Sequence, residues 1–516
     1  MRTYLYKDDT TTMKNYFFAA IIAVSLPGST VWAQCKVDWN NVHQRIDGFG
    51  ASSGFSGITW SQAQANMFFS TNTGVGLSFI RTQIQPGGTI TASELGIAQK
   101  AQALGAKVWS APWSPQISFK DSGTLNGGNF VSANNQAYAN QLAGYVAAMK
   151  NAQGINTYAI SVQNEPDFTT TGYASCAWTA QQFHDFVPYL YNALIASNVA
   201  STKIMLPESE HWQSDTNLYS IALNDSNVAA DVSIIADHNY DGVNFQTGAT
   251  GVPAALPVYG KAMWETEVST GDAYDGSITN AMYWAGRIHL FMTAAQANAW
   301  HYWWLISINS DNEGLTDTSG NPAKRMYVLG NYSRFVRPNY VRIDATNSTD
   351  AQISAYKSTS GNFAIVAING DNTNLNQTFT LTNCTVVGTV TPWITSATLS
   401  LSNQTPISVS NSSFTYTLPA MSVVSFVGQV VDLSIFRIVS ITPTGNDMLV
   451  TWMMEPGATN ALQASAGVPK GDYSTNGFAD IFIVTNNTIV GALTNYQDVG
   501  GATNVPSRYY RVRLAP

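Results

Sequence analysis

The stretch Ser161-Val-Gln-Asn-Glu-Pro166 carries a glutamate after an apolar, β-rich run, and Trp264-Glu-Thr-Glu267 repeats that arrangement further along the chain. Strand-like and helix-like patterns alternate between the two stretches. In a closed barrel of parallel strands, side chains at the carboxyl ends of different strands converge on one mouth. Enzymes that cleave glycosidic bonds typically use two carboxylates that face each other across such a mouth.

The pattern around these stretches predicts an α/β chain that folds as a (β/α)8 TIM barrel. Apolar runs with strand character alternate with helical patterns over about 250 residues, as such barrels require. A doubly wound sheet is the alternative, but no glycine-rich phosphate loop supports it. The predicted strands are residues 46–52, 76–83, 106–112, 157–162, 203–206, 232–239, 261–267 and 299–306, and the predicted helices are residues 92–104, 136–152, 180–197 and 278–297.

The sequence changes character after the predicted barrel, which we place at residues 45–338. Short alternating strands rich in Thr, Ser, Asn and Val follow, and they predict a β-sandwich side domain formed by residues 34–44 and 339–428. Residues 430–516 form a further small all-β module, which resembles fibronectin-III-like or carbohydrate-binding-like end modules. We prefer a spacer or anchoring role for this module to a sugar-binding one, because a fold alone does not fix a function.

The N-terminus is typical of an export signal. Lys14 precedes a short apolar run, and small residues at Ser29 and Ala33 suit a cleavage site, so residues 1–33 are predicted to be a signal peptide. The run is too short to span a bilayer in the mature protein. We therefore expect a secreted protein, extracellular or periplasmic, with no membrane association in its mature form.

The composition favours a polysaccharide as partner. Only 11% of the residues are charged and the net charge is −8, which argues against nucleic acid as a partner. The 14 Trp residues suit either core filling or stacking platforms for sugars. We expect a monomer that needs no cofactor. None of the three cysteines has metal-ligand spacing, and a bridge between Cys35 and Cys384 stays open.

Glu165 suits a general acid at the barrel mouth. The strand before it delivers the side chain to the carboxyl end, and Pro166 then ends regular structure because it cannot donate a ladder hydrogen bond. Asn164 is expected to hold the sugar hydroxyl next to the scissile bond. The plainer interpretation is a solvated loop glutamate.

Glu267 suits a nucleophile at the end of the seventh strand. Alternation puts Glu265 and Glu267 on one face, so the pattern leaves the choice between them open. Arg81, at the end of the second strand, is a plausible cation to keep the nucleophile ionised, although a surface ion pair is the alternative.

Further substrate-binding residues are expected at the ends of other strands. Tyr240 suits a donor to the nucleophile, and His238 suits an orienting group, although a lone histidine there is as readily structural. Because strand side chains alternate, only about half of the aromatic run at residues 302–304 can face the cleft. The remaining candidates are Trp113, Trp264, Tyr173, Tyr302 and Trp304.

From about residue 37 to residue 428 the chain resembles glycoside hydrolase family 30, and most of all the bacterial xylanases of its subfamily 8. The resemblance rests on Ile46-Asp-Gly-Phe-Gly-Ala-Ser52, Ala111-Pro-Trp-Ser-Pro115, Ser161-Val-Gln-Asn-Glu-Pro-Asp167, Trp264-Glu-Thr-Glu267, His301-Tyr-Trp-Trp304 and Phe335-Val-Arg-Pro-Asn-Tyr-Val-Arg-Ile-Asp344. It implies a barrel joined to a β-sandwich and a retaining mechanism. In that mechanism Glu165 is the acid/base and Glu267, rather than Glu265, the nucleophile.

One run departs from the family pattern. Typical members read a glucuronic acid branch through an arginine after the eighth strand, whereas this chain has Trp303-Trp-Leu-Ile-Ser-Ile-Asn-Ser310 and no arginine there. The carboxylate of such a branch would lack the paired N–H donors of a guanidinium group. It would instead approach the carboxylates of Asp311 and Glu313. The resemblance and this departure together imply a secreted endo-β-1,4-xylanase that does not require glucuronic acid branches.

Other readings stay open. Within the family these are a glucuronoxylanase, a xylobiohydrolase, a β-1,6-glucanase or a β-glucosidase. A non-catalytic carbohydrate-binding protein is the alternative from another class, and the presence of both Glu165 and Glu267 argues against it.

Overall fold

The computed structural model describes most of the chain beyond its N-terminal segment. The described residues are 32–55, 57–212, 216–240, 251–347, 351–431, 437–455, 457–467, 477–487, 492–503 and 507–515. Residues 1–31 of the predicted signal peptide lie outside them. Among the described residues, none of the helices combines the length and apolar character that crossing a bilayer demands.

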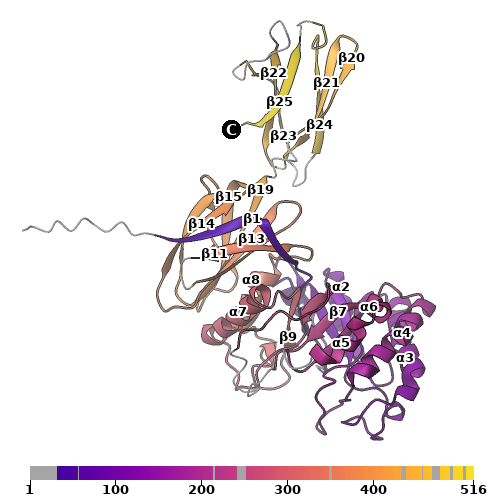
Figure 1. The fold of residues 1–516 in the computed structure, drawn as a ribbon. Helices are drawn as coiled ribbons and strands as arrows, with labels where there is room; N and C mark the ends of the chain where they lie inside the picture. Colours follow the sequence, from indigo (N-terminus) through magenta and orange to yellow (C-terminus); the bar gives the residue numbers. More distant parts are fainter. Residues whose placement is uncertain are drawn as a thin grey trace, which may run out of the picture. The chain divides into compact units, whose positions relative to one another are not determined.

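The predicted barrel is confirmed (Figure 1). Its strands pair in parallel in the order β2-β3-β4-β5-β6-β7-β8-β9, and a further pairing of β9 with β8 closes the ring. The short strand β10 (Gly314–Thr316) adds to β9. The strands of the ring are β2 (Gly48–Ser52), β3 (Phe79–Ile84), β4 (Lys107–Pro112), β5 (Thr157–Ser161), β6 (Lys203–Ser209), β7 (Val232–Asp237), β8 (Ala262–Glu265) and β9 (Ala299–Ile306).

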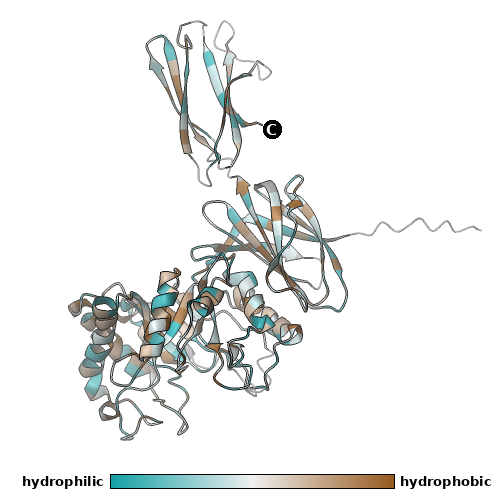
Figure 2. Ribbon diagram, turned by 180° about the vertical axis from the view of Figure 1, so that it is seen from behind, coloured by the Kyte–Doolittle hydropathy of each residue, from teal (hydrophilic) through white to brown (hydrophobic). Residues whose placement is uncertain are grey.

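Helices lie between most of these strands, and local signals fix several of their ends. Thr179 caps α4 and forms a capping box with Gln182. Gly154 ends α3 in the left-handed conformation that glycine adopts without a steric penalty. Hydrophilic and hydrophobic residues both occur along the barrel helices that face the viewer in Figure 2, as expected where one face packs on strands. The helices are α1 (Gln62–Phe69), α2 (Ala92–Ala103), α3 (Asn135–Gln153), α4 (Ala180–Ala196), α5 (Thr216–Asn224), α6 (Ser226–Asp231), α7 (Ile278–Thr293) and α8 (Lys324–Ser333).

Aromatic side chains fill the interior of the barrel. Phe79, Trp109 and Trp264 meet there, with ring centroids 4.7 Å apart for Phe79 and Trp264. His301 packs against all three rings and accepts a hydrogen bond from Trp109. The floor below the mouth is therefore a packed core of the kind that TIM barrels require.

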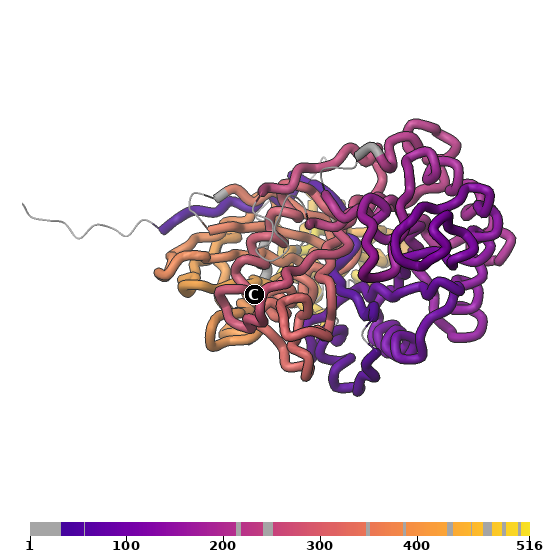
Figure 3. The backbone as a smooth tube through the Cα atoms, turned by 90° about the horizontal axis from the view of Figure 1, so that it is seen from below, coloured from indigo at the N-terminus to yellow at the C-terminus, as the bar shows by residue number. Residues whose placement is uncertain are grey.

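A ten-stranded sheet forms a second core. Its first strand, β1, pairs antiparallel with β11 and parallel with β14, so residues 33–45 lie among strands from much later in the chain (Figure 3). The rings of Phe379 on β14 and Phe426 on β19 lie 4.8 Å apart although four strands separate β14 from β19, so the sheet folds over its own core. The strands are β1 (Ala33–Arg45), β11 (Val341–Asn347), β12 (Gln352–Lys357), β13 (Asn362–Asn369), β14 (Leu375–Thr382), β15 (Thr385–Thr395), β16 (Ser402–Asn403), β17 (Ile407–Ser408), β18 (Ser413–Leu418) and β19 (Ser422–Val431).

The C-terminal segment contains two three-stranded sheets, β20-β21-β24 and β23-β22-β25. Val450, Trp452 and Leu462 are buried at the core of this part. The strands are β20 (Ile438–Thr444), β21 (Asp447–Met454), β22 (Thr459–Ala466), β23 (Ala479–Thr485), β24 (Ala492–Asp498) and β25 (Arg508–Leu514).

The three cysteines are free thiols. Cys35 lies opposite Phe379 in the pairing of β1 with β14, whereas Cys384 lies beyond Thr382, which is opposite Asp38. Several residues of strand thus separate the two sulfur atoms, and the structure does not support a bridge between Cys35 and Cys384.

Candidate active site

A cavity of about 570 Å³ opens where the barrel strands end. Glu165, which follows β5, and Glu267, which follows β8, both line it. Its wall is otherwise mostly aromatic and acidic, with contributions from β9 and from the loops after β2, β4, β5, β6, β7 and β9. The other lining residues are Phe55, Trp113, Phe168, Tyr173, Glu210, Tyr240, Trp303, Trp304, Ile308, Asn309 and Glu313.

The backbone around Glu165 is held by the neighbouring strands. The amide of Asn164 donates to the carbonyl of Pro112 and that of Glu165 to the carbonyl of Glu208, each at 2.9 Å. Glu165 has a φ of 45°, a left-handed conformation that costs a residue with a Cβ roughly 1–2 kcal/mol. Such a conformation persists only where the surrounding structure fixes it. The surrounding fold therefore determines the direction in which the Glu165 side chain points.

The carboxylate of Glu165 has two protein partners. The Tyr173 hydroxyl donates to one oxygen at 3.2 Å, and His238 Nδ1 lies 3.1 Å from the other. His238 follows β7 and is fully buried, whereas Tyr173 is well exposed at the cavity rim. One partner therefore fixes the carboxylate from below and the other from the solvent side.

Glu267 lies two residues beyond the end of β8, and Glu265 is the last residue of that strand. The Glu267 carboxylate accepts hydrogen bonds from the Arg81 guanidinium and, at 3.1 Å, from the Tyr240 hydroxyl. The Glu265 carboxylate is fully buried in the barrel wall and accepts from the backbone amide of His301 at 2.9 Å. Burial raises the pKa of Glu265 well above its usual range, and only Glu267 of the two lines the cavity.

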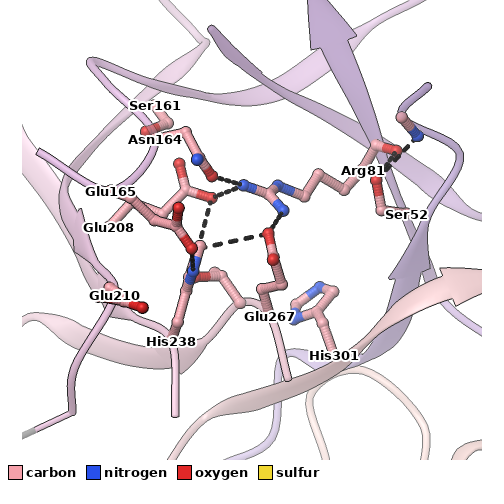
Figure 4. A network of polar contacts seen from close by, with 12 residues as sticks. Ser52, Arg81, Ser161, Asn164, Glu165, Glu208, Glu210, His238, Glu267 and His301 are labelled. Atoms are coloured by element: carbon pink, nitrogen blue, oxygen red, sulfur yellow. Dashed lines mark hydrogen bonds and ion pairs between the residues drawn. The ribbon is translucent and has the colours of Figure 1, made fainter. Parts of the chain in front are cut away.

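The two cavity glutamates face each other across a short gap (Figure 4). A carboxylate oxygen of Glu165, one of Glu267 and a ring nitrogen of His238 all lie within 4.8 Å of one another. A sugar ring seated between the two carboxylates could be approached by both.

Arg81 and a third carboxylate form the buried base of the site. The guanidinium pairs with Glu267 and, at 2.6 Å, with Glu208, and it donates to the side-chain oxygen of Asn164. The guanidinium carbon of Arg81, Cζ, lies 4.5 Å from the centroid of the Trp113 ring. Arg81 and Glu208 are fully buried, so these two charges compensate each other out of reach of solvent.

The charge of His238 follows from this environment. Burial alone would lower the pKa of His238, but the carboxylates of Glu267, Glu165 and Glu208 raise it well above its usual range. The ring is therefore an imidazolium at neutral pH, donating toward Glu165 and Glu208. Burial raises the pKa of Glu267, while the positive charges of His238 and Arg81 act in the opposite direction.

The ligand geometry of Glu165, His238 and Glu267 is compact enough for a metal ion, but the surrounding charges oppose one. A ring nitrogen that carries a proton cannot bind a metal. The guanidinium of Arg81 already pairs with Glu267, and it would repel a divalent cation. The donor set fits an organic substrate better than a metal.

Three tryptophans and Phe55 form the aromatic wall. Trp303 and Trp304 are neighbours on β9 and both line the cavity, with ring centroids 5.0 Å apart. An irregularity in the pairing of β2 with β9 makes this possible, because Tyr302 pairs with Ala51 and Trp304 with Ser52, so Trp303 is passed over. Simple alternation, which allows only one of two neighbours to face the cleft, does not hold here.

The predictions for Trp264 and Tyr302 are wrong. Trp264 is fully buried in the barrel interior, where its ring stacks on Tyr158 and its indole nitrogen donates to Asp47 at 2.9 Å. Tyr302 points away from the cavity and packs on Trp284 of α7 at 4.9 Å. Trp264 lies deeper in the barrel than the mouth, and Tyr302 faces the helices outside the barrel, so neither side chain reaches the cavity.

The structure brings the other candidates to the site. Arg81, Asn164 and His238 lie beneath the two glutamates, while Trp113, Tyr173, Tyr240 and Trp304 line the cavity. Five residues of the site are not predicted from the sequence: Glu208, Glu210, Trp303, Phe55 and Phe168. For Glu208 and Glu210 a signal existed, because both lie at the end of β6, where the rule that identified Glu165 applies equally.

Comparisons with known proteins identify similar enzymes. Glucuronoxylanase XynC of Bacillus subtilis (strain 168) is 32% identical over 404 residues, which cover 74% of this chain and 89% of that protein. No family model matches the chain.

Two solved structures are similar as well. The glycoside hydrolase family 30 subfamily 8 xylanase Xyn30A of Clostridium acetobutylicum is 34% identical with a TM-score of 0.68, covering 77% of this chain and 99% of that one. A GH30 endoxylanase of Clostridium papyrosolvens C71 is 31% identical with a TM-score of 0.65, covering 77% of this chain and 100% of that one.

Proposed function

This chain belongs to glycoside hydrolase family 30, and from that premise we propose that it is a retaining endo-β-1,4-xylanase. The observation that carries the proposal is the pair of cavity carboxylates, Glu165 and Glu267, facing each other across a gap of under 4.8 Å between their nearest oxygens. Retaining glycosidases hold their two carboxyl groups about 5–5.5 Å apart, whereas inverting enzymes need about 6.5–9.5 Å to fit a water molecule. The spacing here supports retention.

In the proposed first step, the Glu267 carboxylate attacks the anomeric carbon while the Glu165 carboxyl protonates the leaving oxygen. The bond to the leaving sugar breaks as an ester bond to Glu267 forms. In the second step Glu165 takes a proton from water, and the resulting hydroxide displaces Glu267 from the anomeric carbon. The two inversions together retain the configuration.

The surrounding groups suit these roles. Arg81 and the Tyr240 hydroxyl both donate to Glu267, which stabilises the ionised nucleophile and orients it. Asn164 is held by Arg81 through its side-chain oxygen, which leaves its amide nitrogen as a donor for a sugar hydroxyl. The imidazolium of His238 lies between the carboxylates of Glu165 and Glu208 and fixes the first of them.

The xylan specificity comes from the relatives, which are named as glucuronoxylanase and endoxylanase. The charges in the cavity favour an unbranched, neutral glycan. Among the described residues that line it, four are glutamates and none is a lysine or arginine. A glucuronate branch would find no guanidinium fork there and would face Glu313. We therefore propose hydrolysis that does not require glucuronic acid branches.

Replacing Glu313 with glutamine should raise the kcat/KM for glucuronoxylan relative to linear xylan by about tenfold, because like charges at close range cost several kcal/mol. Burial raises the pKa of Glu313 to about 7, so its carboxyl is neutral below that pH and charged above it. A sugar carboxylate stays ionised throughout. In the wild-type protein the preference for linear xylan should therefore weaken as the pH falls through 7, and in Glu313→Gln it should not change.

Glu210→Gln is the matched control, since Glu210 lines the cavity on the Glu165 side and burial raises its pKa to about 7 as well. This variant should leave the branch preference unchanged. Equal ratios of the two activities in wild type and Glu313→Gln at pH 8 would refute the assignment to Glu313.

We also propose that turnover needs no metal ion. Dialysis against a chelator should leave kcat on linear xylan within about 20% of the untreated value, because Arg81 and protonated His238 occupy the positions where a cation would bind. A loss of activity that added divalent metal restores would contradict this.

Product sizing tests the proposed function. Linear xylo-oligosaccharides, glucuronoxylan and β-1,6-glucan are incubated with the protein, and the products are resolved by mass and anomeric configuration. Mixed short xylo-oligosaccharides from the linear substrate support the proposal. Release of xylobiose alone indicates a xylobiohydrolase, activity only on glucuronoxylan a glucuronoxylanase, and activity on β-1,6-glucan or on aryl β-glucoside a glucanase or glucosidase.

Two further proposals concern the rest of the chain. We propose secretion, supported by the signal-like composition of residues 1–33. We propose that residues 432–516, which follow β19 and whose described part has its own buried core, form a separate spacer or anchoring module.

A further inference from the structure

Lys120 is a buried charge, and no described carboxylate lies within ion-pair distance of it. It lies in the loop between β4 and α3 and is only 7% exposed. Its ammonium donates to Ser114 Oγ at 2.9 Å and to the carbonyls of Leu125 and Ser175 at 2.7 Å each. The three hydrogen atoms of an ammonium are thus matched by three oxygens. Burying such a group is costly unless it is fully hydrogen-bonded, as it is here.

The partners of Lys120 belong to two different loops. Ser114 and Leu125 lie in the loop after β4, whereas Ser175 lies in the loop after β5 that follows Glu165. The same two loops are joined by Ser175 Oγ, which accepts from the amide of Gly127 at 2.9 Å, and by the amide of Ala177, which donates to the carbonyl of Gly128 at 2.9 Å. We call this set of hydrogen bonds between the two loops, made by Lys120, Ser175 and Ala177, the seam. Lys120 is its charged, central member.

The seam ends two residues from a contact with the proposed acid/base. Tyr173 precedes Ser175 by two positions, and its hydroxyl donates to Glu165 at 3.2 Å. We propose that Lys120 is a positioning residue for the acid/base step: by fixing the carbonyl of Ser175 it holds Tyr173 against Glu165. This inference rests on the proposed function and concerns the step in which Glu165 protonates the leaving oxygen.

Leaving-group chemistry separates this role from a purely structural one. A sugar alkoxide needs a proton from Glu165 as it departs, whereas a dinitrophenolate departs without one. Because kcat/KM reports the steps up to formation of the glycosyl-enzyme, a defect in acid positioning lowers it for oligosaccharides and spares activated aryl glycosides. A general loss of folded protein lowers both equally.

The test compares kcat/KM of wild type and Lys120→Met on xylotetraose and on 2,4-dinitrophenyl β-xylobioside. We expect the variant to lose about tenfold or more on xylotetraose and to stay within about twofold on the aryl glycoside. Tyr173→Phe should give the same pattern. The double variant should lose little beyond either single variant, because both act on one contact.

Lys324→Met is the matched control. The Lys324 ammonium also holds a loop, donating to the carbonyl of Leu399 at 2.8 Å and to Ser400 Oγ at 3.0 Å, but it lies on α8 and contacts none of the cavity residues named above. Its replacement should lower the melting temperature without changing the ratio of the two activities. Should Lys120→Met not fold, Ser175→Ala, which removes the second tie of the seam, must shift the ratio in the same direction.

Equal losses on both substrates in a folded Lys120→Met, or an unchanged ratio in both Lys120→Met and Ser175→Ala, would overturn the proposal. Failure of the proposed function is seen separately in the wild type, which would then hydrolyse neither xylo-substrate. In that case the same ratio can be measured with aryl glycosides of whichever sugar the wild type accepts.

Discussion

Replacing Glu267 with alanine should lower kcat on linear xylan by at least about 10⁴-fold, the scale on which removal of a covalent nucleophile acts. Without this carboxylate no glycosyl-enzyme can form, and Arg81 is left without one of its two carboxylate partners. The measurement is release of reducing ends, combined with azide rescue on an activated aryl xylobioside. Azide fills the space of the missing carboxylate and should yield a glycosyl azide of inverted configuration.

Glu265→Gln is the control for that result. Burial raises the pKa of Glu265, and glutamine preserves its size and its acceptor for the His301 amide, so activity should fall by less than about tenfold. If Glu267→Ala retained most of its turnover while Glu265→Gln lost it, the nucleophile would have been assigned to the wrong glutamate.

The second large effect is expected for Glu165→Ala. Hydrolysis of linear xylan should fall by about 10²–10⁴-fold, the usual contribution of a general acid. Formation of the glycosyl-enzyme from dinitrophenyl xylobioside should persist, since that leaving group needs no proton. Its breakdown should be slow, because no base activates water, and pre-steady-state kinetics should therefore reveal a burst of dinitrophenolate.

Azide rescue also distinguishes the role of Glu165 from that of Glu267. It should accelerate turnover of Glu165→Ala and give a glycosyl azide of retained configuration, opposite to the product from Glu267→Ala. An equal loss of Glu165→Ala on the aryl and the natural substrate, with no burst and no rescue, would remove Glu165 from the acid/base role.

Much of the barrel could be predicted from the sequence because its signals are local. The predicted helix at residues 180–197 is α4 (Ala180–Ala196), which begins at the capping Thr179. The predicted strand at residues 157–162 is β5 (Thr157–Ser161). The strand predicted at 261–267 ends earlier, at Glu265, because the pairing of β7 with β8 ends there. Strand ends are set by neighbouring strands, and a single sequence does not contain that information.

The errors at the site have the same cause. Trp264 and Tyr302 are aromatic and lie near strand ends, which predicts cavity positions, but Trp264 lies too deep in the barrel and Tyr302 points outward onto α7. Trp303 was missed because a pairing irregularity overrides alternation. The buried pairing of Arg81 with Glu208 joins β3 to β6, and no local pattern links those two residues.

Covalent trapping tests most directly whether Glu165 and Glu267 act together on one sugar ring. A 2-deoxy-2-fluoroxylobioside with a dinitrophenyl leaving group should inactivate the protein with one label per chain. Mass spectrometry of the digested protein should find that label on Glu267, in the peptide that contains Trp264-Glu-Thr-Glu267, and not on Glu265. A label on any other residue, or an active protein that hydrolyses the parent xylobioside with inversion and accumulates no labelled form, would contradict the account.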